Sequence, residues 1–380
     1  MREELIIVGA GFAARQLVRH LRQQDRTRPI RLITADSGDD YNKPDLSHVF
    51  TNGQRADDLT RQRAGEWAEQ NDIALHPLTQ VTAIDTAART VETSAGTFSW
   101  QQLVLATGAQ AIVPPVSGSE LMFTLNSQQE YRRCEAALRD ARRVLVLGGG
   151  LIGTELAMDL NRAGKQVTLV DTSTSLLSAI LIPEISARLQ TVLMQHGVTL
   201  RLSTGLSSLA RHHDSLVATL TDGHQQSVDA VVCAIGLRPD LTLAQRAGLV
   251  TGRGIVVDDR LATSHPDIYA LGDCAEIRGQ LLPFLQPVQL CAMTLARNLT
   301  GAAQNLTLPA MLVKVKTPLM PLHLAGDTGN RELTWEVCIS PGGIIARGMD
   351  GQGVLRGFVV SEDQMKQAFG LLKALNAANA

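Results

Sequence analysis

Two glycine-rich segments, residues 9–14 and 148–153, have the composition and spacing of dinucleotide-binding turns. Small residues at the first, third and sixth positions permit a tight turn, a close approach of the backbone to a diphosphate, and close packing of the following helix. The free amide groups at the start of that helix then face the negative charge. The residues expected to contact the cofactors here are Gly9, Gly11 and Ala14 in the first segment and Gly148, Gly150, Ile152 and Gly153 in the second.

An acidic residue follows each of these segments at the end of the next apolar run. Asp36 follows residues 30–34, and Asp171 follows residues 167–170. A carboxylate at this place accepts hydrogen bonds from ribose hydroxyl groups but repels a 2′-phosphate. Because Asp171 is followed by threonine and serine residues, with no arginine close by in the sequence, we expect the second site to bind NADH rather than NADPH.

Each turn is framed by the elements that would position it. Residues 5–8 and 144–147 are apolar runs typical of buried strands, and a helical pattern follows each turn. Two strand–helix–strand units that each end in an acid favour two bound dinucleotides over glycine turns with a purely structural role.

The order of the later segments indicates which cofactor belongs to which unit. Strand-like runs end near Thr107 and Gly108, near Gly236 and at Asp273, so the first unit resumes after the second is complete. An outer domain built from several pieces can hold a long cofactor permanently, and we expect FAD there. The compact inner domain suits a cofactor that exchanges, and we expect NADH there, with Gly236 among its contacts.

The sequence therefore predicts an α/β protein with two Rossmann-like dinucleotide-binding domains, the second inserted in the first, and a small C-terminal α+β domain. The predicted boundaries are residues 1–109 and 239–308 for a discontinuous FAD-binding domain, 110–238 for an NAD-binding domain, and 309–380 for the C-terminal domain.

Composition argues against several other classes of protein. The chain is 44% hydrophobic and 19% charged, with a formal net charge of -2, which disfavours disorder and a nucleic-acid partner. No apolar run is long enough to span a membrane, and residues 1–4 show no cleavable signal. The five cysteines form no Cys-x-x-Cys pair, so we expect a cytoplasmic protein without a metal site.

Four further pieces accompany the two glycine-rich segments: residues 41–47, residues 106–108, Glu155 and Gly272-Asp273. Taken together, these motifs resemble the FAD-dependent pyridine nucleotide oxidoreductase family, which has a glutathione-reductase-like fold. A more specific signal comes from residues 41–47, 53–59, 282–287 and 313–318. On these stretches the chain is most similar, within that family, to the bacterial rubredoxin reductases.

The resemblance implies roles for further residues. The implied contacts with FAD are Asp36 to the ribose, Lys43 and Pro44 to the pyrophosphate and isoalloxazine, Val81 to the adenine, Thr107 and Gly108 close to the cofactor, and Asp273 to the ribityl chain. An alternative for Asp273 is that it caps the N-terminus of a helix.

One departure from the family narrows the expected chemistry. Members that reduce disulfides or peroxides place a cysteine near the flavin early in the chain, whereas this chain has Leu46-Ser47-His48 there. A thiolate is the operative nucleophile in those enzymes. Without it, an electron-transfer protein is the expected acceptor.

A second departure concerns charge near the flavin. Similar ferredoxin reductases often carry a lysine at the place of His48, paired with the glutamate that matches Glu155. We hypothesise that Lys316 supplies the missing charge and pairs with Glu155, because a cation near the hydride-accepting nitrogen would stabilise reduced flavin. The alternative is that Lys316 is a solvated strand residue.

The resemblance implies a reductase that passes electrons from NADH through FAD to a rubredoxin or a flavorubredoxin, the acceptor in anaerobic nitric oxide detoxification. Three alternatives stay open: a ferredoxin reductase of a dioxygenase system, an NADH oxidase and, from a different class, an NADH-responsive binding protein. The sequence leaves the oligomeric state open.

Overall fold

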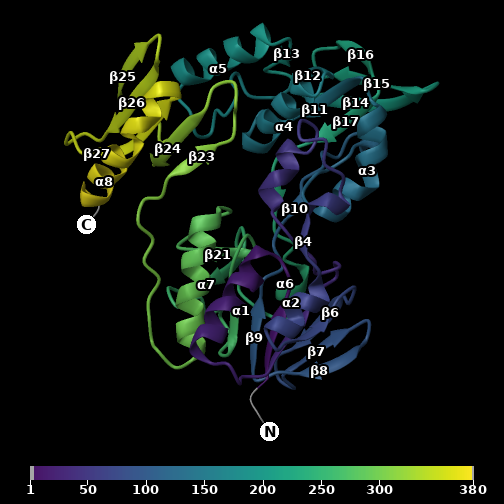
Figure 1. Ribbon diagram of the computed structural model, residues 1–380, viewed down its shortest axis with the longest axis vertical. Helices are drawn as coiled ribbons and strands as arrows, with labels where there is room; N and C mark the ends of the chain where they lie inside the picture. Colours follow the sequence, from purple (N-terminus) through teal and green to yellow (C-terminus); the bar gives the residue numbers. More distant parts are fainter. Residues whose placement is uncertain (1–3, 379–380) are drawn as a thin grey trace. The chain divides into compact units, whose positions relative to one another are not determined.

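The computed structural model describes residues 4–378, which form two compact units (Figure 1). The first unit contains the described residues up to Asn42 together with Thr60–Gln110 and Leu237–Leu308. The second contains Lys43–Leu59, Ala111–Gly236 and the described residues from Pro309 onward. Residues 1–3, part of the segment predicted to carry no cleavable signal, lie outside the described residues.

A five-stranded parallel sheet forms the centre of the first unit, with the strands in the order β20-β9-β1-β2-β5. All four residues of β1 are buried, as expected for a parallel strand that is covered on both faces. The strands are β1 (Leu5–Val8), β2 (Ile30–Ile33), β5 (Ala74–His76), β9 (Gln102–Leu105) and β20 (Ile268–Ala270).

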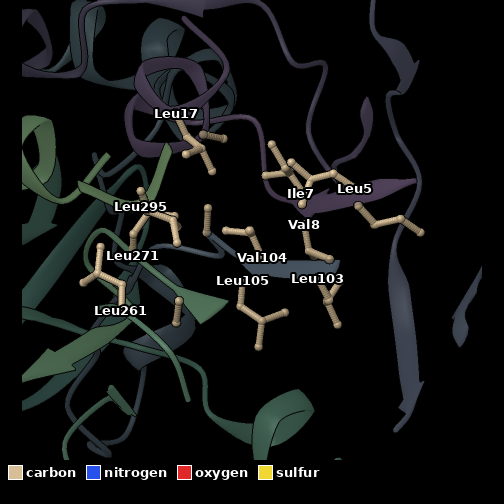
Figure 2. Close-up of a cluster of buried hydrophobic side chains, with 14 of the residues drawn as sticks. Leu5, Ile7, Val8, Leu17, Leu103, Val104, Leu105, Leu261, Leu271 and Leu295 are labelled. Atoms are coloured by element: carbon tan, nitrogen blue, oxygen red, sulfur yellow. The ribbon is translucent and has the colours of Figure 1, made fainter. Parts of the chain in front are cut away.

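Helices α1 (Phe12–Gln24) and α7 (Leu285–Leu299) lie side by side in the first unit. Their apolar faces bury Leu17 of α1 and Leu295 of α7 in one cluster with Leu105 of β9, which Figure 2 shows. These side chains are at most 1% exposed. This core fixes the ends of β1 and β9, where the first glycine turn and Thr107 lie.

Smaller elements complete the first unit. Two antiparallel groups, β6-β7-β8 and β3-β4, and a mixed group, β19-β21-β22, lie outside the central sheet. The elements are β3 (Asp40–Tyr41), β4 (Thr60–Gln62), α2 (Ala64–Gln70), β6 (Val81–Asp85), β7 (Thr90–Thr93), β8 (Gly96–Ser99), α6 (Thr242–Arg246), β19 (Ile255–Val257), β21 (Ala275–Ile277) and β22 (Gln280–Leu281).

A second parallel sheet, in the order β13-β12-β11-β17, forms the centre of the second unit. The antiparallel strands β14, β15 and β16 form a separate sheet in this unit. The elements are η3 (Ser119–Leu121), α3 (Gln128–Asp140), β11 (Arg143–Leu147), α4 (Leu151–Arg162), β12 (Gln166–Val170), α5 (Pro183–Gln195), β13 (Thr199–Arg201), β14 (Leu206–His212), β15 (Ser215–Leu220), β16 (Gln225–Val228) and β17 (Ala230–Cys233).

The segment Lys43–Leu59 belongs to the second unit although it lies early in the chain. It contains two 3₁₀ helices, η1 (Lys43–His48) and η2 (Asp57–Leu59). Helix α3 holds it through Gln128, whose side-chain amide donates to the carbonyl of Ala56 at 2.6 Å, and through Tyr131, whose hydroxyl donates to the carbonyl of Gln54 at 2.9 Å. These contacts with α3 explain why the segment Lys43–Leu59 belongs to the second unit.

The C-terminal part of the second unit is a five-stranded antiparallel sheet in the order β23-β24-β27-β26-β25, covered by a terminal helix (Figure 1). Phe358 of β27 and Leu375 of the helix are fully buried between them. The elements are β23 (Val313–Val315), β24 (Leu322–Gly326), β25 (Thr334–Ser340), β26 (Gly343–Met349), β27 (Leu355–Ser361), η4 (Glu362–Gln367) and α8 (Ala368–Ala378).

The predicted α/β fold class with two Rossmann-like halves and a C-terminal α+β part is confirmed. The exact domain boundaries stay a prediction. Two short strands, β10 (Gln110–Ala111) and β18 (Leu237–Arg238), fall where the chain passes from one unit to the other. In the described part of the chain, no helix is long and apolar enough to cross a membrane.

Candidate cofactor sites

The first glycine turn is held by the ends of three neighbouring strands. Gly9 follows β1, its amide donates to the carbonyl of Ile33 at 2.8 Å, and its φ is +108°. A Cβ atom built on Gly9 would lie 2.2 Å from the carbonyl oxygen of Ala106, which follows β9. Only glycine fits this backbone, so the turn depends on its sequence.

The start of α1 is open in a way that fits a diphosphate. Gly11 is the N-cap of α1, and no side chain caps the first turn of this helix. A Cβ atom on Gly11 would meet nothing within 4 Å, so the missing side chain leaves space beside the free amide groups. Ala14, the third small residue of the motif, is fully buried.

The residues expected to bind the adenosine half of FAD meet near the end of β2. The amide of Leu78 donates to the carbonyl of Asp36 at 3.0 Å, and the amide of Thr79 donates to the carbonyl of Thr34 at 2.8 Å. These bonds bring the start of β6, where Val81 lies, to the loop that carries Asp36. The carboxylate of Asp36 accepts the Ser37 amide at 2.7 Å.

The remaining first-unit candidates also surround the start of α1. Thr107 and Gly108 follow β9, and Gly108 has a φ of +70°. Gly272 comes so close to α1 that a Cβ atom on it would lie 2.8 Å from the Cβ of Ala13, which brings the neighbouring Asp273 to this helix. Strand β21 begins at Ala275, so the alternative that Asp273 caps a helix is wrong.

The second glycine turn repeats the geometry of the first. Gly148 has a φ of +113°, its amide donates to the carbonyl of Val170 at 2.8 Å, and a Cβ atom on it would lie 2.4 Å from the carbonyl oxygen of Ala234. Gly150 is the N-cap of α4, with open space where a Cβ would project. A Cβ on Gly153 would lie 1.9 Å from the carbonyl oxygen of Gly148.

Asp171 lies at the end of β12, directly beside this second turn. Its carboxylate accepts the amides of Gly149 and Ser173. The neighbouring strand brings Arg201 close, because the carbonyl of Arg201 accepts the Asp171 amide at 2.9 Å. The Arg201 guanidinium contacts the ring of His224 at 3.3 Å, a partner other than Asp171.

Two other candidates of the second site lie near the same turn. Ile152 is in the first turn of α4 and is 39% exposed. Gly236 follows β17 with a φ of +130°, and a Cβ on it would lie 3.6 Å from Ile112. The structure thus brings together the second-site residues that the sequence singled out.

Glu155 of α4 joins three segments of the second unit. Its Oε2 accepts the hydroxyl of Ser47 in η1 at 2.8 Å, and its Oε1 accepts the backbone amide of Lys316 after β23 at 2.8 Å. Burial raises the pKa of the Glu155 carboxyl, and these two hydrogen bonds oppose that rise, as do the nearby charges of His48 and Lys316.

The Lys316 ammonium has a different partner. Its Nζ donates to the carbonyl of Pro44 at 3.2 Å, so the direct bond with Glu155 comes from the backbone of Lys316. Lys43 and Pro44 open η1, and Pro44 also accepts the Ser47 hydroxyl at 3.2 Å. Lys316 and Glu155, the predicted catalytic pair, are therefore neighbours. They are joined through the backbone amide of Lys316 rather than through the ammonium that the sequence suggested.

Asp159 was missed by the sequence interpretation. It is 2% exposed, and its two carboxylate oxygens accept the amides of Phe50 at 2.9 Å and Thr51 at 3.0 Å. Its position one helical turn after Glu155, on the same face of α4, was the available signal. The two acids together bind the segment that begins at Lys43.

Four of the five cysteines have thiols whose ionisation burial disfavours. All five are free, and only Cys338 is exposed. Burial raises the pKa of Cys134 and of Cys291 to about 12, and it also raises the pKa of Cys233 and of Cys274. Within residues 4–378, no group of three or more histidine, cysteine or acidic residues could hold a metal ion.

Comparison with known families gives two matches that together cover most of the chain. Residues 3–298 match the family described as "Pyridine nucleotide-disulphide oxidoreductase". Residues 305–375 match the family described as "Rubredoxin binding C-terminal domain".

Similar proteins match this chain over nearly its whole length. A protein of Escherichia coli (strain SE11) named "Nitric oxide reductase FlRd-NAD(+) reductase" is 60% identical over 99% of this chain and 100% of its own. A protein of the same name from Salmonella paratyphi C (strain RKS4594) is 59% identical over the same shares.

Solved structures of similar fold include two electron-transfer reductases. The ferredoxin reductase for the CYP199A2 system from Rhodopseudomonas palustris has a TM-score of 0.89 at 26% identity, covering 97% of this chain and 93% of that one. Putidaredoxin reductase in its covalent complex with putidaredoxin has a TM-score of 0.88 at 25% identity, covering 99% and 93%. On these matches and on the two glycine turns, the chain belongs to the pyridine nucleotide-disulphide oxidoreductase family.

Proposed function

We propose that this chain is an NADH-dependent FAD oxidoreductase that passes electrons to a rubredoxin-type iron protein. The observation that carries the proposal is the order of parts in one chain: two dinucleotide turns of matching geometry, then residues 305–375, which match a rubredoxin-binding domain. The relatives at about 60% identity are named as reductases of the flavorubredoxin of a nitric oxide reductase system. The acceptor is accordingly a rubredoxin or a flavorubredoxin, and the role is anaerobic nitric oxide detoxification in the cytoplasm.

The residues of the first unit fit FAD. Gly9 and Gly11 leave room for a diphosphate at the open start of α1, and Asp36 presents a carboxylate at the end of β2. Val81, Thr107, Gly108 and Asp273 lie around the same edge and complete the proposed contacts. Bound FAD supplies the chemistry of accepting a hydride and releasing electrons singly, while the chain binds and orients it.

The residues of the second unit fit NADH. Gly148, Gly150 and Gly153 form the turn, and Ile152 and Gly236 lie at its sides. The carboxylate of Asp171 accepts the Gly149 amide of the turn, and its negative charge would repel the 2′-phosphate of NADPH. We therefore propose a preference for NADH over NADPH.

Ser47 supports a protein acceptor rather than a disulfide. Thiol-dependent family members carry a cysteine directly after the Leu-Ser step, where this chain has His48, and the Ser47 hydroxyl donates to Glu155 at 2.8 Å. A hydroxyl in that environment is a fixed hydrogen-bond donor and no redox group. The raised pKa values of the four buried thiols agree with this interpretation.

Lys316 and Glu155 are the proposed polar groups near the flavin, with Lys43 and Pro44. In this arrangement Glu155 holds η1 through Ser47 and holds the end of β23 through the Lys316 amide. The Lys316 ammonium does not bond to Glu155 and places its positive charge beside the carbonyl of Pro44. A cation at this position stabilises negative charge that develops on a neighbouring group.

The test is anaerobic NADH oxidation by the purified protein, with rubredoxin or a [2Fe–2S] ferredoxin as acceptor in parallel assays. We expect rapid turnover with rubredoxin and slow turnover with ferredoxin. A ferredoxin preference would assign the chain to the ferredoxin reductases that its fold also resembles. Equal turnover in air without any carrier would indicate an NADH oxidase, and slow turnover with every acceptor would indicate an NADH-responsive binding protein.

A further inference from the structure

A buried arginine follows the first glycine turn directly. Arg15 of α1 is 3% exposed. Its Nε donates to the carbonyl of Ala10 at 3.2 Å, and its NH2 group donates to the carbonyl of Gly38. The guanidinium also lies 3.5 Å from the carboxylate of Asp40 and 4.2 Å from the ring centre of Trp67.

These contacts join three segments at the edge of the proposed FAD site. Ala10 belongs to the glycine turn, Gly38 to the loop after Asp36, and Trp67 to α2. The loop itself packs against the turn, because a Cβ atom on Gly38 would lie 3.7 Å from the Cβ of Ala10. Arg15 therefore lies where the turn and the ribose-binding loop meet.

The second unit shows what the arginine adds. Thr154 occupies the matching position after Gly153, and its hydroxyl donates to the carbonyl of Gly149 at 3.3 Å, as Arg15 does to Ala10. A threonine is too short to reach the next loop. There the link between turn and loop is made by Asp171, which accepts the Gly149 amide.

The first unit makes this link differently. Within residues 4–378, the carboxylate of Asp36 accepts only the amide of Ser37 next to it, so Asp36 does not tie the loop to the turn. Arg15 ties them instead, through Ala10 on one side and Gly38 on the other. The carboxylate of Asp36 thereby keeps its remaining acceptor capacity for ribose hydroxyls.

Burying the guanidinium of Arg15 costs free energy that a purely structural role would not repay. Burial lowers the pKa of Arg15, with Asp40 opposing that shift, and the NH1 group has no partner among the described residues. Removing a guanidinium from water costs free energy that incomplete pairing does not recover. Thr154 of the second unit makes the matching bond to its glycine turn without burying a charge. The guanidinium of Arg15 therefore has a role beyond its bond to Ala10.

We propose that Arg15 is a positioning residue of the FAD site. It fixes the loop of Asp36–Gly38 against the glycine turn, so that the ribose-binding carboxylate and the diphosphate-binding amides are held at the spacing of one cofactor. This role rests on the proposed assignment of FAD to the first unit. Preorganisation of this kind lowers the cost of ordering the loop when the cofactor binds.

The test compares Arg15→Met and Arg15→Lys with a matched control, Arg22→Met. Arg22 lies on the same helix and donates to the carbonyls of Asn71 and Asp72, far from the glycine turn. The apoproteins are titrated with FAD, and the dissociation constant is read from quenching of flavin fluorescence. The rise in unfolding temperature at saturating FAD is measured on the same samples.

We expect Arg15→Met to raise the FAD dissociation constant by about tenfold or more, which corresponds to about 1.4 kcal/mol. Arg15→Lys should raise it less, because lysine keeps the charge but cannot donate as a fork to Ala10 and Gly38 together. Arg22→Met should lower the unfolding temperature of the apoprotein and leave the FAD dissociation constant within about twofold of wild type.

Two outcomes would overturn the role of Arg15 alone: wild-type FAD affinity in both Arg15 variants, or an equal loss of affinity in Arg22→Met. If Arg15→Met does not fold, Arg15→Lys decides. A wild-type chain that binds no FAD would overturn the proposed cofactor as well, so the two failures are distinguishable.

Discussion

The backbone amide of Lys316 donates to Oε1 of Glu155 at 2.8 Å, while the ammonium of the same lysine donates to the carbonyl of Pro44 at 3.2 Å. One residue thus contacts both α4 and η1 through different atoms. Substitution of its side chain leaves the amide bond to Glu155 in place. The contribution of the charge can therefore be measured separately from that of the contact.

Lys316→Met removes the ammonium and keeps the backbone bond. We expect flavin reduction by NADH to slow by about tenfold, because a fixed cation that stabilises developing negative charge is lost. FAD content should stay normal. Stopped-flow absorbance of the flavin under anaerobic conditions measures the rate. Lys314→Met, at an exposed lysine of β23 two residues earlier, is the control and should keep the wild-type rate. A wild-type rate in both variants would remove Lys316 from the site.

Ser47→Ala removes the hydroxyl that donates to Glu155. This hydrogen bond lowers the pKa of Glu155 against the raising effect of burial, so its loss raises that pKa further. The rate of flavin reduction should fall as pH decreases through the pKa of Glu155, because ionised Glu155 accepts the bonds that hold η1 and Lys316.

The acid limb of the pH profile should consequently move to higher pH in Ser47→Ala, by up to about one unit. The measurement is the rate of NADH-dependent flavin reduction at a series of pH values. Glu155→Gln, which cannot ionise, should show no acid limb in the same range. An acid limb that persists unchanged in Glu155→Gln would assign it to another group.

Asp159→Ala leaves the amides of Phe50 and Thr51 without their acceptor, and both hydrogen bonds are partly buried. We expect the free energy of unfolding to fall by about 2 kcal/mol, since an unsatisfied donor costs about 1–3 kcal/mol when it is fully buried. Asp159→Asn keeps one oxygen and should lose about half as much. Urea denaturation followed by circular dichroism gives the values.

The control for this series is Arg132→Ala, which breaks an exposed ion pair with Asp57 in the same segment. It should cost less than about 1 kcal/mol. Equal destabilisation by Asp159→Ala and Arg132→Ala would show that Asp159 has no special part in holding the segment.

Alkylation with iodoacetamide tests the absence of a thiol step. Four of the five cysteines are buried, and burial raises the pKa of each, so only Cys338 should react in the native protein. Mass spectrometry should find a single modified cysteine per chain after treatment of the NADH-reduced protein. Turnover with rubredoxin should be unchanged, and its loss would point to a thiol in the electron path.

The glycine turns could be predicted because their requirements are local. Gly9 and Gly148 lie at a positive φ against a neighbouring carbonyl, and any side chain there would overlap backbone atoms. The acids at the ends of β2 and β12 follow from the same pattern. The contact of Asp273 with the ribityl chain stays a prediction, while its alternative role as a helix cap was wrong.

The contacts of the second unit could not be predicted in the same way. Ser47 and Glu155 are 108 residues apart, and Lys316 and Glu155 are 161 apart. Which atom of Lys316 meets the carboxylate depends on how the chain turns after β23, and residue type does not encode that choice. Arg15 was overlooked because the glycine pattern draws attention to small residues, although its position after Ala14 was visible in the sequence.

The interleaving of the two units has a consequence for how the protein is made on the ribosome. The first unit is complete only when α7 (Leu285–Leu299) has been synthesised, and the second only when the C-terminal strands have followed. The early segment Lys43–Leu59 must wait for α3 and α4 before its carbonyl and amide groups find partners. Nascent chains therefore complete both units late, and termination of translation before α7 yields neither unit intact.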